Sequence, residues 1–284
     1  LQENNANTEQ KRKANACIVV LTRNDDLYDI RHSMRQLEDR FNHKYNYPYV
    51  FLNNEPFTQG FINVTSAMTK ANVSYGLIPK EHWSVPSDID KERLSISLES
   101  PLPRSSELTY HHMCSYDYYW RLEPGVDFYC DIDFDPFVYM KENDIKYGFT
   151  LVQYEEFDTI PTLWNTVKEF IKIYPHLITN DSIFDFITND NGETYNLCQF
   201  WSNFEIGDLN LWRSDEYSIF FNFLDEKGGF YYERWGDAPI HTIATALFLK
   251  KHQVRYFEEI GYYHHEVINC PQGNEFLSKC DCRP

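Results

Sequence analysis

A strand, a helix and a second strand follow one another early in the chain, and this order most constrains the fold. ACIVVLT, residues 16–22, is a continuous run of small and β-branched residues that predicts a buried strand of a parallel sheet. Hydrophobic residues then recur at helical spacing over residues 27–42, with Asp26 as the expected N-cap, and PYVFLN, residues 48–53, predicts the next strand. This βαβ unit indicates an α/β fold with a ligand site beyond the carboxyl ends of its strands.

The rest of the chain continues to alternate strands and helices, and no linker divides it. Strands are predicted at residues 116–122 and 146–153, helices at 163–174, 212–226 and 238–249, and a loop-rich excursion at 75–110. We therefore expect one domain over residues 16–284, preceded by a polar segment, residues 1–15, that we interpret as the remnant of a stem.

The charge balance limits the class of ligand. Acidic residues outnumber basic ones 43 to 26, which gives a formal net charge of −17. A surface of this sign repels phosphate backbones, so nucleic acid is not expected as a partner. A phosphate-bearing ligand would need a divalent cation or a few placed basic groups.

The cysteines and glycosylation motifs point to an oxidising compartment. Seven cysteines are present, three of them close together at Cys270, Cys280 and Cys282, and Asn-X-Ser/Thr motifs occur at Asn63, Asn72 and Asn180. We expect disulfides with one cysteine left unpaired, and a zinc site at the three terminal cysteines is the alternative. The chain as given shows neither a signal peptide nor a run of about 18 apolar residues, so it is expected to be soluble.

Acidic residues are concentrated in WRLEPGVDFYCDIDFD, residues 120–135. Asp131 and Asp133 match the short D-x-D pattern by which nucleotide-sugar transferases hold Mn²⁺ or Mg²⁺. Glu123 is a second candidate, because it ends a predicted strand and precedes a Pro-Gly turn. A third interpretation is that these acidic residues are simply solvated at the surface. The residue pattern alone does not distinguish the three interpretations.

Longer stretches resemble a known family. DYYWRLEPGVDFYCDIDFDPF, CQFWSNFEIGDLNLWRSDEY and GGFYYERWGDAPIHTIATALF are similar to segments of the fungal Kre2/Mnt1 family of α-1,2-mannosyltransferases, glycosyltransferase family 15. LTRNDDLYDIRHSMRQLEDRFNHKYNYPYVFLNNEPF and IPKEHW fit the same pattern, so the resemblance covers residues 16–282. It implies a single GT-A type domain, with a mixed central sheet flanked by helices.

The resemblance also implies an activity and a metal site. The expected reaction moves mannose from GDP-mannose, with retention, to the 2-hydroxyl of an acceptor mannose on secretory glycoproteins, with Mn²⁺ as cofactor. The family's metal-binding glutamate corresponds to Glu123, and the histidine of its G-Y-x-H segment corresponds to His264, not to the nearby His265 or to His241. Asp131 and Asp133 then take a structural or supporting role.

Further site residues follow from the same resemblance. Glu205 matches the proposed catalytic nucleophile; a carboxylate there could form a glycosyl ester or stabilise positive charge while attack and departure occur on one face. Tyr110 matches a family tyrosine near donor and acceptor. Thr22 and Arg23, after the first strand, are expected to contact the nucleotide. Asp237 is a candidate for the acceptor hydroxyls, and Trp235 for stacking on a sugar.

The chain departs from the family at two places. Between Cys114 and Ser115 the family has an additional stretch, and we expect the printed sequence to lack a mobile loop there; SISLESPLPRSSE, residues 95–107, is a second place where residues are expected to be missing. The family's N-terminal membrane anchor is also not seen. We expect the natural protein to be a single-pass type II membrane protein of the Golgi lumen, attached to the membrane only through that anchor.

Two other functions fit parts of the pattern. One is a catalytically silent mannan-binding or assembly subunit of the same fold, although Glu123, Glu205 and His264 are all present. The other is a retaining glycoside hydrolase that uses Glu205 with a second acid.

Overall fold

The computed structural model describes residues 13–80, 89–90, 92 and 115–282. Tyr110, Cys114 and most of the predicted excursion at 75–110 lie outside these residues, so the predictions made for them are not tested. The described chain is α/β and is built around a mixed sheet flanked by helices.

A seven-stranded sheet forms the centre of the molecule, with strand order β10-β6-β9-β4-β1-β2-β3. The strands β1 to β4 are mutually parallel, whereas β9 runs antiparallel to both β4 and β6, and β10 is parallel to β6. Their bounds are β1 Ala16–Leu21, β2 Tyr49–Asn53, β3 Val73–Leu77, β4 Tyr118–Arg121, β6 Tyr147–Phe149, β9 Ile206–Asp208 and β10 Val254–Tyr256.

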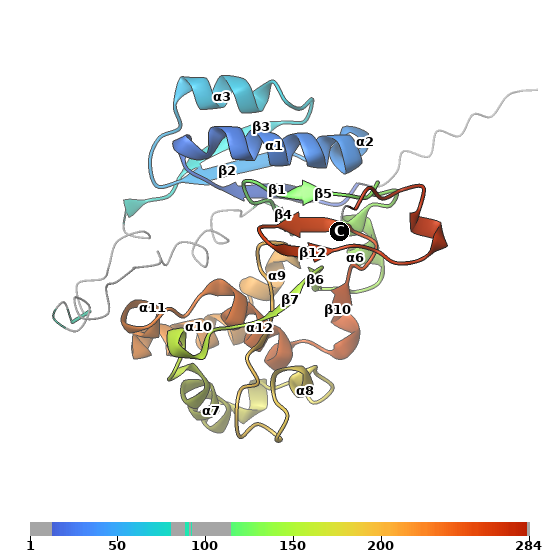
Figure 1. Cartoon of the computed structure of the whole chain (residues 1–284). Helices are drawn as coiled ribbons and strands as arrows, with labels where there is room; N and C mark the ends of the chain where they lie inside the picture. Colours follow the sequence, from blue (N-terminus) through green and yellow to red (C-terminus); the bar gives the residue numbers. More distant parts are fainter. Residues whose placement is uncertain (1–12, 81–88, 91, 93–114, 283–284) are drawn as a thin grey trace, which may run out of the picture.

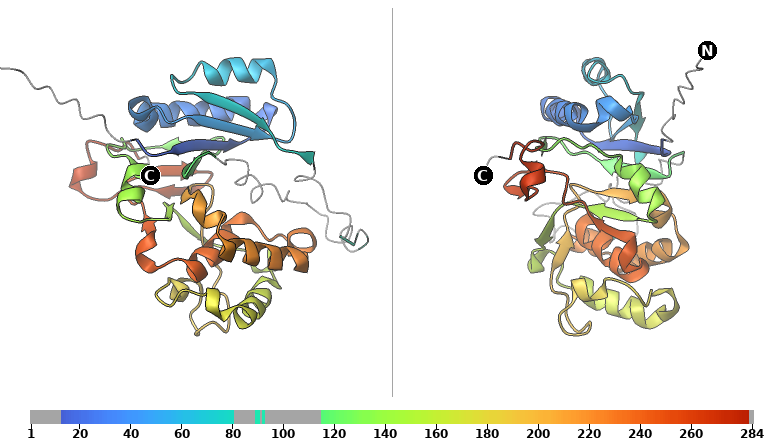
Figure 2. Two further views of the ribbon diagram at one scale, coloured as in Figure 1. Left: turned by 180° about the vertical axis from the view of Figure 1, so that it is seen from behind. Right: turned by 90° about the vertical axis from the view of Figure 1, so that its right-hand side faces the viewer.

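Helices cover both faces of this sheet, as Figure 1 shows, with α1 and α3 on one side and α7, α10 and α12 on the other. Figure 2 shows the same separation from behind and from the side. Alternate residues of β1 point to the two layers: Ile18 and Val20 belong to the core beneath α1, and Cys17 and Val19 to the core that includes α7, α10 and α12. This two-sided burial is the reason that β1 is apolar throughout.

The four predicted helices lie close to their predicted ranges, as α1, α7, α10 and α12, whereas α3, α6, α8 and α11 were not predicted. The bounds are α1 Leu27–Leu37, α2 His43–Tyr45, α3 Gln59–Ser66, α6 Pro136–Glu142, α7 Leu163–Ile173, α8 Phe184–Ile187, α9 Leu209–Trp212, α10 Asp215–Lys227, α11 Gly229–Tyr232 and α12 Asp237–Phe248. A π-helical segment, Glu38–Asn42, joins α1 to α2, so the predicted helix at 27–42 is nearly continuous. Gly228 ends α10 with φ +74°, a left-handed conformation that suits glycine.

Two small sheets lie beside the central one. The strands β5 (Asp127–Phe128), β11 (Tyr262–His264) and β12 (Val267–Asn269) form an antiparallel sheet in the order β12-β11-β5, and β7 (Val152–Tyr154) pairs with β8 (Cys198–Phe200). The single strand predicted at 146–153 was therefore wrong. It is two strands, because β6 joins the central sheet through β9 and β10 whereas β7 pairs with β8 in another sheet.

Disulfides hold the C-terminal segment. Cys130 is bonded to Cys280, and Cys270 to Cys282. The predicted disulfides are thus confirmed at the three terminal cysteines, and the zinc alternative is wrong because their sulfurs are used in these bonds. The number of unpaired cysteines stays a prediction, since Cys114 lies outside the described residues. Over the described part of the chain, every helix is too short or too polar to cross a lipid bilayer.

Candidate functional site

The sheet topology brings distant parts of the sequence to one edge. Because β1 and β4 are parallel neighbours, Thr22 and Glu123 both follow strands that end at the same edge. β9 runs the opposite way beside β4, so Glu205, directly before β9, lies at that edge too; its carbonyl accepts a hydrogen bond from the Arg121 backbone N–H at 2.9 Å. Three predicted site residues are therefore collected there by strand order alone.

Arg121, the last residue of β4, joins two of the predicted carboxylates. Its Nε donates to Glu123 Oε1 at 2.6 Å, and its Nη1 forms an ion pair with Asp237 Oδ2 at the start of α12. The three side chains are between 15% and 19% exposed, so the attraction acts in a partly desolvated place. Arg121 thereby fixes Glu123 relative to Asp237, which lies 116 residues after Arg121 in the sequence.

Asp237 is held as a carboxylate. Its Oδ1 accepts hydrogen bonds from Ser202 Oγ at 3.0 Å and from the Ala238 backbone N–H at 2.9 Å. Burial raises the pKa of this carboxyl, but the charges of Arg121 and then His241 oppose it more strongly and bring the pKa down to about 2. Asp237 is therefore negatively charged at any physiological pH.

Glu205 lies at the centre of a buried polar group. Its carboxylate Oε2 accepts a hydrogen bond from Tyr147 Oη at 3.1 Å and lies 2.9 Å from His241 Nδ1. Glu205, Tyr147 and His241 are all fully buried, and the His241 ring stacks on Trp212 with ring centroids 4.2 Å apart. These contacts leave the carboxylate little freedom to rotate, which is what a precisely placed charge requires.

His264, at the end of β11, has the properties of a neutral imidazole available to a metal. Burial lowers its pKa to about 4, with further contributions from His265 and Arg121, so the ring is uncharged at neutral pH. The ring stacks on Trp201 at 5.3 Å, and its Nδ1 is buried with no hydrogen-bond partner among the residues that the structure describes. A buried imidazole nitrogen without a partner fits the demands of metal ligation.

Glu123 precedes the Pro-Gly turn noted in the sequence. Gly125 takes φ +73°, a conformation that glycine tolerates readily, and its N–H donates to the Asp29 carbonyl of α1 at 3.2 Å. Arg121, which donates a hydrogen bond to Glu123, also contributes by its charge to the lowered pKa of His264. Within the described ranges no group of three or more potential ligands occurs, so Glu123 and His264 would supply only part of a coordination shell.

Thr22 and Arg23 follow β1 at the same edge. Thr22 is buried, and its hydroxyl donates to Asp26 Oδ2 at 3.3 Å, while the Arg23 backbone N–H donates to the same oxygen at 2.9 Å. Asp26 precedes α1 as predicted, but its carboxylate accepts these two bonds and does not cap the helix N–H groups. The exposed Arg23 side chain stays at the edge of the sheet, where it can meet a ligand.

The aspartates of the D-x-D pattern have partners of their own at the surface. Asp131 pairs with Arg40 at 2.8 Å, and Asp133 with Lys279 at 2.9 Å and with Lys44 at 3.4 Å. These contacts suit the structural role that was expected once Glu123 became the metal candidate.

Trp235 is only 5% exposed, and its indole N–H donates to Glu233 at 2.7 Å. Most of its ring is therefore used in packing, and the idea that it stacks on a sugar stays a prediction.

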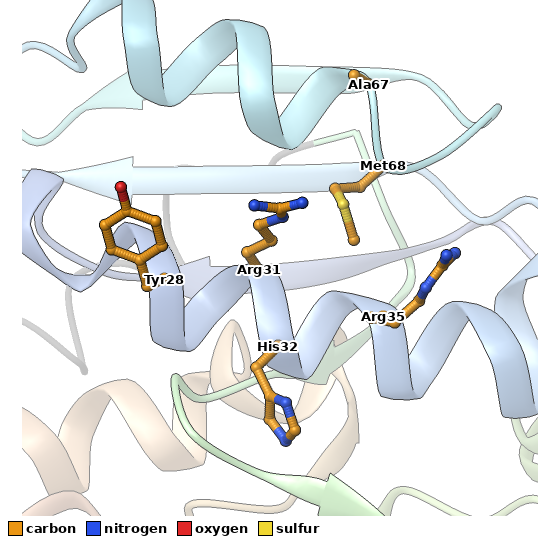
Figure 3. A pocket seen from close by; sticks show the side chains of 6 residues that line it. All are labelled: Tyr28, Arg31, His32, Arg35, Ala67 and Met68. Atoms are coloured by element: carbon orange, nitrogen blue, oxygen red, sulfur yellow. The ribbon is translucent and has the colours of Figure 1, made fainter.

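A separate open pocket of about 450 Å³ lies between α1 and the end of α3. Figure 3 shows Arg31 and Arg35 along α1 with Met68 facing them, whereas His32 points away. None of the predicted site residues lines this pocket.

Three contributors to the site were missed or misjudged from the sequence. Arg121 precedes Glu123 by two residues, which is the spacing of side chains on one face of a strand. His241 follows Asp237 by four residues on a predicted helix, and this spacing puts both on one face. Tyr147 carried no local signal, because its partner Glu205 is 58 residues away in the sequence.

Comparison with known proteins places this geometry in a family. The family model described as "Glycolipid 2-alpha-mannosyltransferase" matches residues 1–284. Glycolipid 2-alpha-mannosyltransferase 2 of Candida albicans is 47% identical and covers 96% of this chain, which spans 63% of that protein's length. Alpha-1,2 mannosyltransferase KTR1 of Saccharomyces cerevisiae is 46% identical over 95% of this chain and 74% of its own.

Solved structures agree with the sequence comparison. Core-mannan synthase A from Aspergillus fumigatus, in an Mn/GDP form, superposes with a TM-score of 0.86 at 38% identity, covering 98% of this chain and 81% of its own. The mannosyltransferase Ktr4p from S. cerevisiae gives a TM-score of 0.90 at 38% identity, covering 96% of this chain and 76% of its own. The GT-A type fold expected from the sequence is thus confirmed, and the chain belongs to the glycolipid 2-alpha-mannosyltransferase family of glycosyltransferases.

Proposed function

We propose that this protein is a Mn²⁺-dependent, retaining α-1,2-mannosyltransferase that moves mannose from GDP-mannose to the 2-hydroxyl of an acceptor mannose. The observation that carries the proposal is the group of carboxylates at the edge of the sheet: Glu123 and Asp237 joined by Arg121, beside the buried Glu205. Family membership, and similarity to mannosyltransferase structures solved with Mn and GDP or with GDP, support the choice of donor and metal.

Glu123 and His264 would hold the metal. A carboxylate oxygen and a neutral imidazole are both suitable ligands for Mn²⁺, and the remaining positions are left for donor oxygens and water. When bound, the ion supplies positive charge that neutralises the diphosphate leaving group. Arg121 adds a fixed positive charge next to Glu123, and it keeps that carboxylate turned toward one side.

Thr22 and Arg23 would contact the nucleotide, and Asp237 the acceptor hydroxyls. Because the pKa of Asp237 is near 2, its carboxylate can accept hydrogen bonds from sugar hydroxyls but cannot serve as a proton donor at neutral pH. Tyr110 is proposed to act near donor and acceptor on the strength of the family pattern alone.

Glu205 is the proposed catalytic residue. Retention needs either a glycosyl ester on a carboxylate or attack and departure on one face of the sugar. In both routes the carboxylate must be charged and fixed, and Tyr147 and His241 support this by holding one of its oxygens. In the same-face route Glu205 stabilises the positive charge that develops on the mannosyl ring.

We also propose that the protein works in the Golgi lumen on secretory glycoproteins, held there by a type II membrane anchor. Two disulfides support an oxidising compartment.

Incubation with GDP-mannose, Mn²⁺ and methyl α-mannoside tests the proposal. The expected product is a disaccharide that an α-1,2-specific mannosidase cleaves, and its formation should stop when a chelator removes the metal. If the donor stays intact and calorimetry still detects mannoside binding, the protein is a silent binding subunit. Release of free sugar from mannan without nucleotide would indicate a hydrolase.

A further inference from the structure

A second pocket with the character of a sugar-binding site lies outside the carboxylate cluster. It has a volume of about 190 Å³ and lies between the 3-10 turn Phe157–Thr159, the first turn of α7 and the segment that precedes β8. Its lining combines the aromatic rings of Phe157, Trp164 and Tyr195 with the polar side chains of Asn165 and Thr194. The volume is below the range of about 300–1,000 Å³ typical of drug-sized sites, so a single sugar ring is the appropriate size of ligand.

The aromatic wall is rigid. Trp164 and Tyr195 stack with centroids 5.6 Å apart and an interplanar angle of 19°. The Trp164 indole N–H donates to the Gly192 carbonyl at 3.1 Å, and the Tyr195 hydroxyl donates to the Cys198 carbonyl at 2.8 Å. With their polar atoms bonded to backbone, both rings are fixed before any ligand arrives, which lowers the entropic cost of binding.

Phe157 supplies the apolar surface that a sugar would cover. Its side chain is 59% exposed and lines the pocket together with the core residues Ile160 and Trp164. A hexose has one face rich in C–H groups and a rim of hydroxyls, so it pairs an aromatic ring with nearby amide and hydroxyl groups. Asn165 and Thr194, both exposed, offer such groups at the rim of the pocket.

The pocket borders the segment that carries Asp237. Thr162, next to the pocket residue Pro161, donates its hydroxyl to Glu233 at 2.6 Å, and the same carboxylate accepts the Trp235 indole N–H at 2.7 Å. The Arg234 N–H donates to the Thr159 carbonyl at 2.8 Å. The turn at Phe157 and the approach to Asp237 are therefore tied together as one piece of structure.

We propose that this pocket binds one hexose residue of an extended glycan, separately from the catalytic cluster. Phe157 covers the apolar face of the ring, and Asn165 and Thr194 accept and donate hydrogen bonds to its hydroxyls. The role of this site in retaining long acceptors rests on the proposed function, whereas the binding itself does not. The two ideas can thus fail independently.

Nuclear magnetic resonance of the Trp164 indole N–H tests binding directly. The signal is identified by its loss in Trp164→Phe, and the probe is α-1,2-linked mannotriose, titrated without nucleotide or metal because paramagnetic Mn²⁺ broadens NMR signals. We expect a saturable shift in the unaltered protein. Phe157→Ala should weaken binding about tenfold, the effect of losing one good aromatic contact.

Tyr154→Ala is the matched control. Tyr154 is also an exposed aromatic residue, 74% exposed on β7 nearby, but it does not line the pocket, so its removal should leave the titration unchanged. The melting temperatures of both variants check that each is folded. Absence of a Trp164 shift in the unaltered protein, or equal weakening in the two variants, would overturn the proposal.

A kinetic measurement then tests the role in catalysis. With methyl α-mannoside as acceptor, Phe157→Ala should keep both kcat and KM, and with long mannan chains it should raise KM about tenfold at unchanged kcat. A binding shift at Trp164 in a protein that transfers no mannose would leave this inference standing and reject the proposed function. If Phe157→Ala has the same kcat and KM as the unaltered protein on long mannan chains, the proposed role in retaining long acceptors is rejected.

Discussion

Replacing Arg121 with methionine should destabilise the protein about twice as much at pH 7 as at pH 3. Methionine keeps much of the volume of the side chain but removes the charge that joins Glu123 and Asp237. Both carboxylates are less than 20% exposed, so water can replace little of the lost interaction. The variant therefore leaves two negative charges close together and poorly solvated.

The size of the effect follows from the pKa of Asp237. An aspartate that titrates at about 2 instead of about 4 has its charged form stabilised by about 2 kcal/mol. Adding the uncompensated charge of Glu123, we expect the variant to lose about 3 kcal/mol of unfolding free energy at pH 7, the lower end of the cost of breaking a buried ion pair. The contribution of Asp237 is complete above its unfolded pKa of about 4 and disappears as the pH falls toward 2, because its folded pKa is depressed.

Urea unfolding followed by tryptophan fluorescence at pH 7 and pH 3 measures this difference. We expect the difference in unfolding free energy between the unaltered protein and Arg121→Met to fall at pH 3 to about half of its value at pH 7. Asp237→Asn added to Arg121→Met should restore part of the loss at pH 7. Arg35→Met is the control, because the Arg35–Asp39 pair is 3.7 Å long and more than 60% exposed, and it should cost less than about 0.5 kcal/mol. The same difference in unfolding free energy at both pH values would refute the reasoning.

Three further predictions concern the metal, the buried histidine and a disulfide. Glu123→Ala should weaken Mn²⁺-dependent GDP binding at least tenfold by calorimetry, and Asp133→Ala should leave it unchanged; equal losses would mean that the wrong carboxylate was chosen. His241→Phe keeps a ring on Trp212 but removes the contact to Glu205, so kcat should fall about 100-fold with KM nearly constant, whereas a change confined to KM would contradict the positioning role. Cys130→Ser should lower the unfolding free energy by about 2–4 kcal/mol, and this loss should disappear when both proteins are compared under reducing conditions.

Much of the fold could be predicted from local hydrophobic periodicity, because the elements of the N-terminal half follow that pattern. β1, α1 and β2 have strong hydrophobic periods, and their strands are parallel neighbours in chain order. β9 was not predicted: it has only three residues, one of which is glycine, and its place between β4 and β6 depends on pairing with distant strands. Local periodicity carries no information about such pairings.

The candidate site, too, could be predicted only in part. Glu123, Glu205 and His264 were proposed from family motifs, and Thr22 from its position after a strand. The contacts that fix them were not, because Arg121 and His241 act on partners 116 and 36 residues away in the sequence. His241 was set aside as a neighbour of the expected ligand, although its spacing from Asp237 on α12 could have marked it as a member of the site.

The antiparallel pairing of β9 with β4 also determines when the site can be complete during synthesis of the chain. Thr22 directly follows β1 and His264 ends β11, so most of the sequence between them must be synthesised before the parts of the site can meet. A nascent chain that ends before Glu205 contains β1, β2 and β3 with α1 and α3, but it lacks both the proposed catalytic carboxylate and β9, the strand that pairs with the second edge of β4. The site can therefore be complete only after the chain has been synthesised through β11.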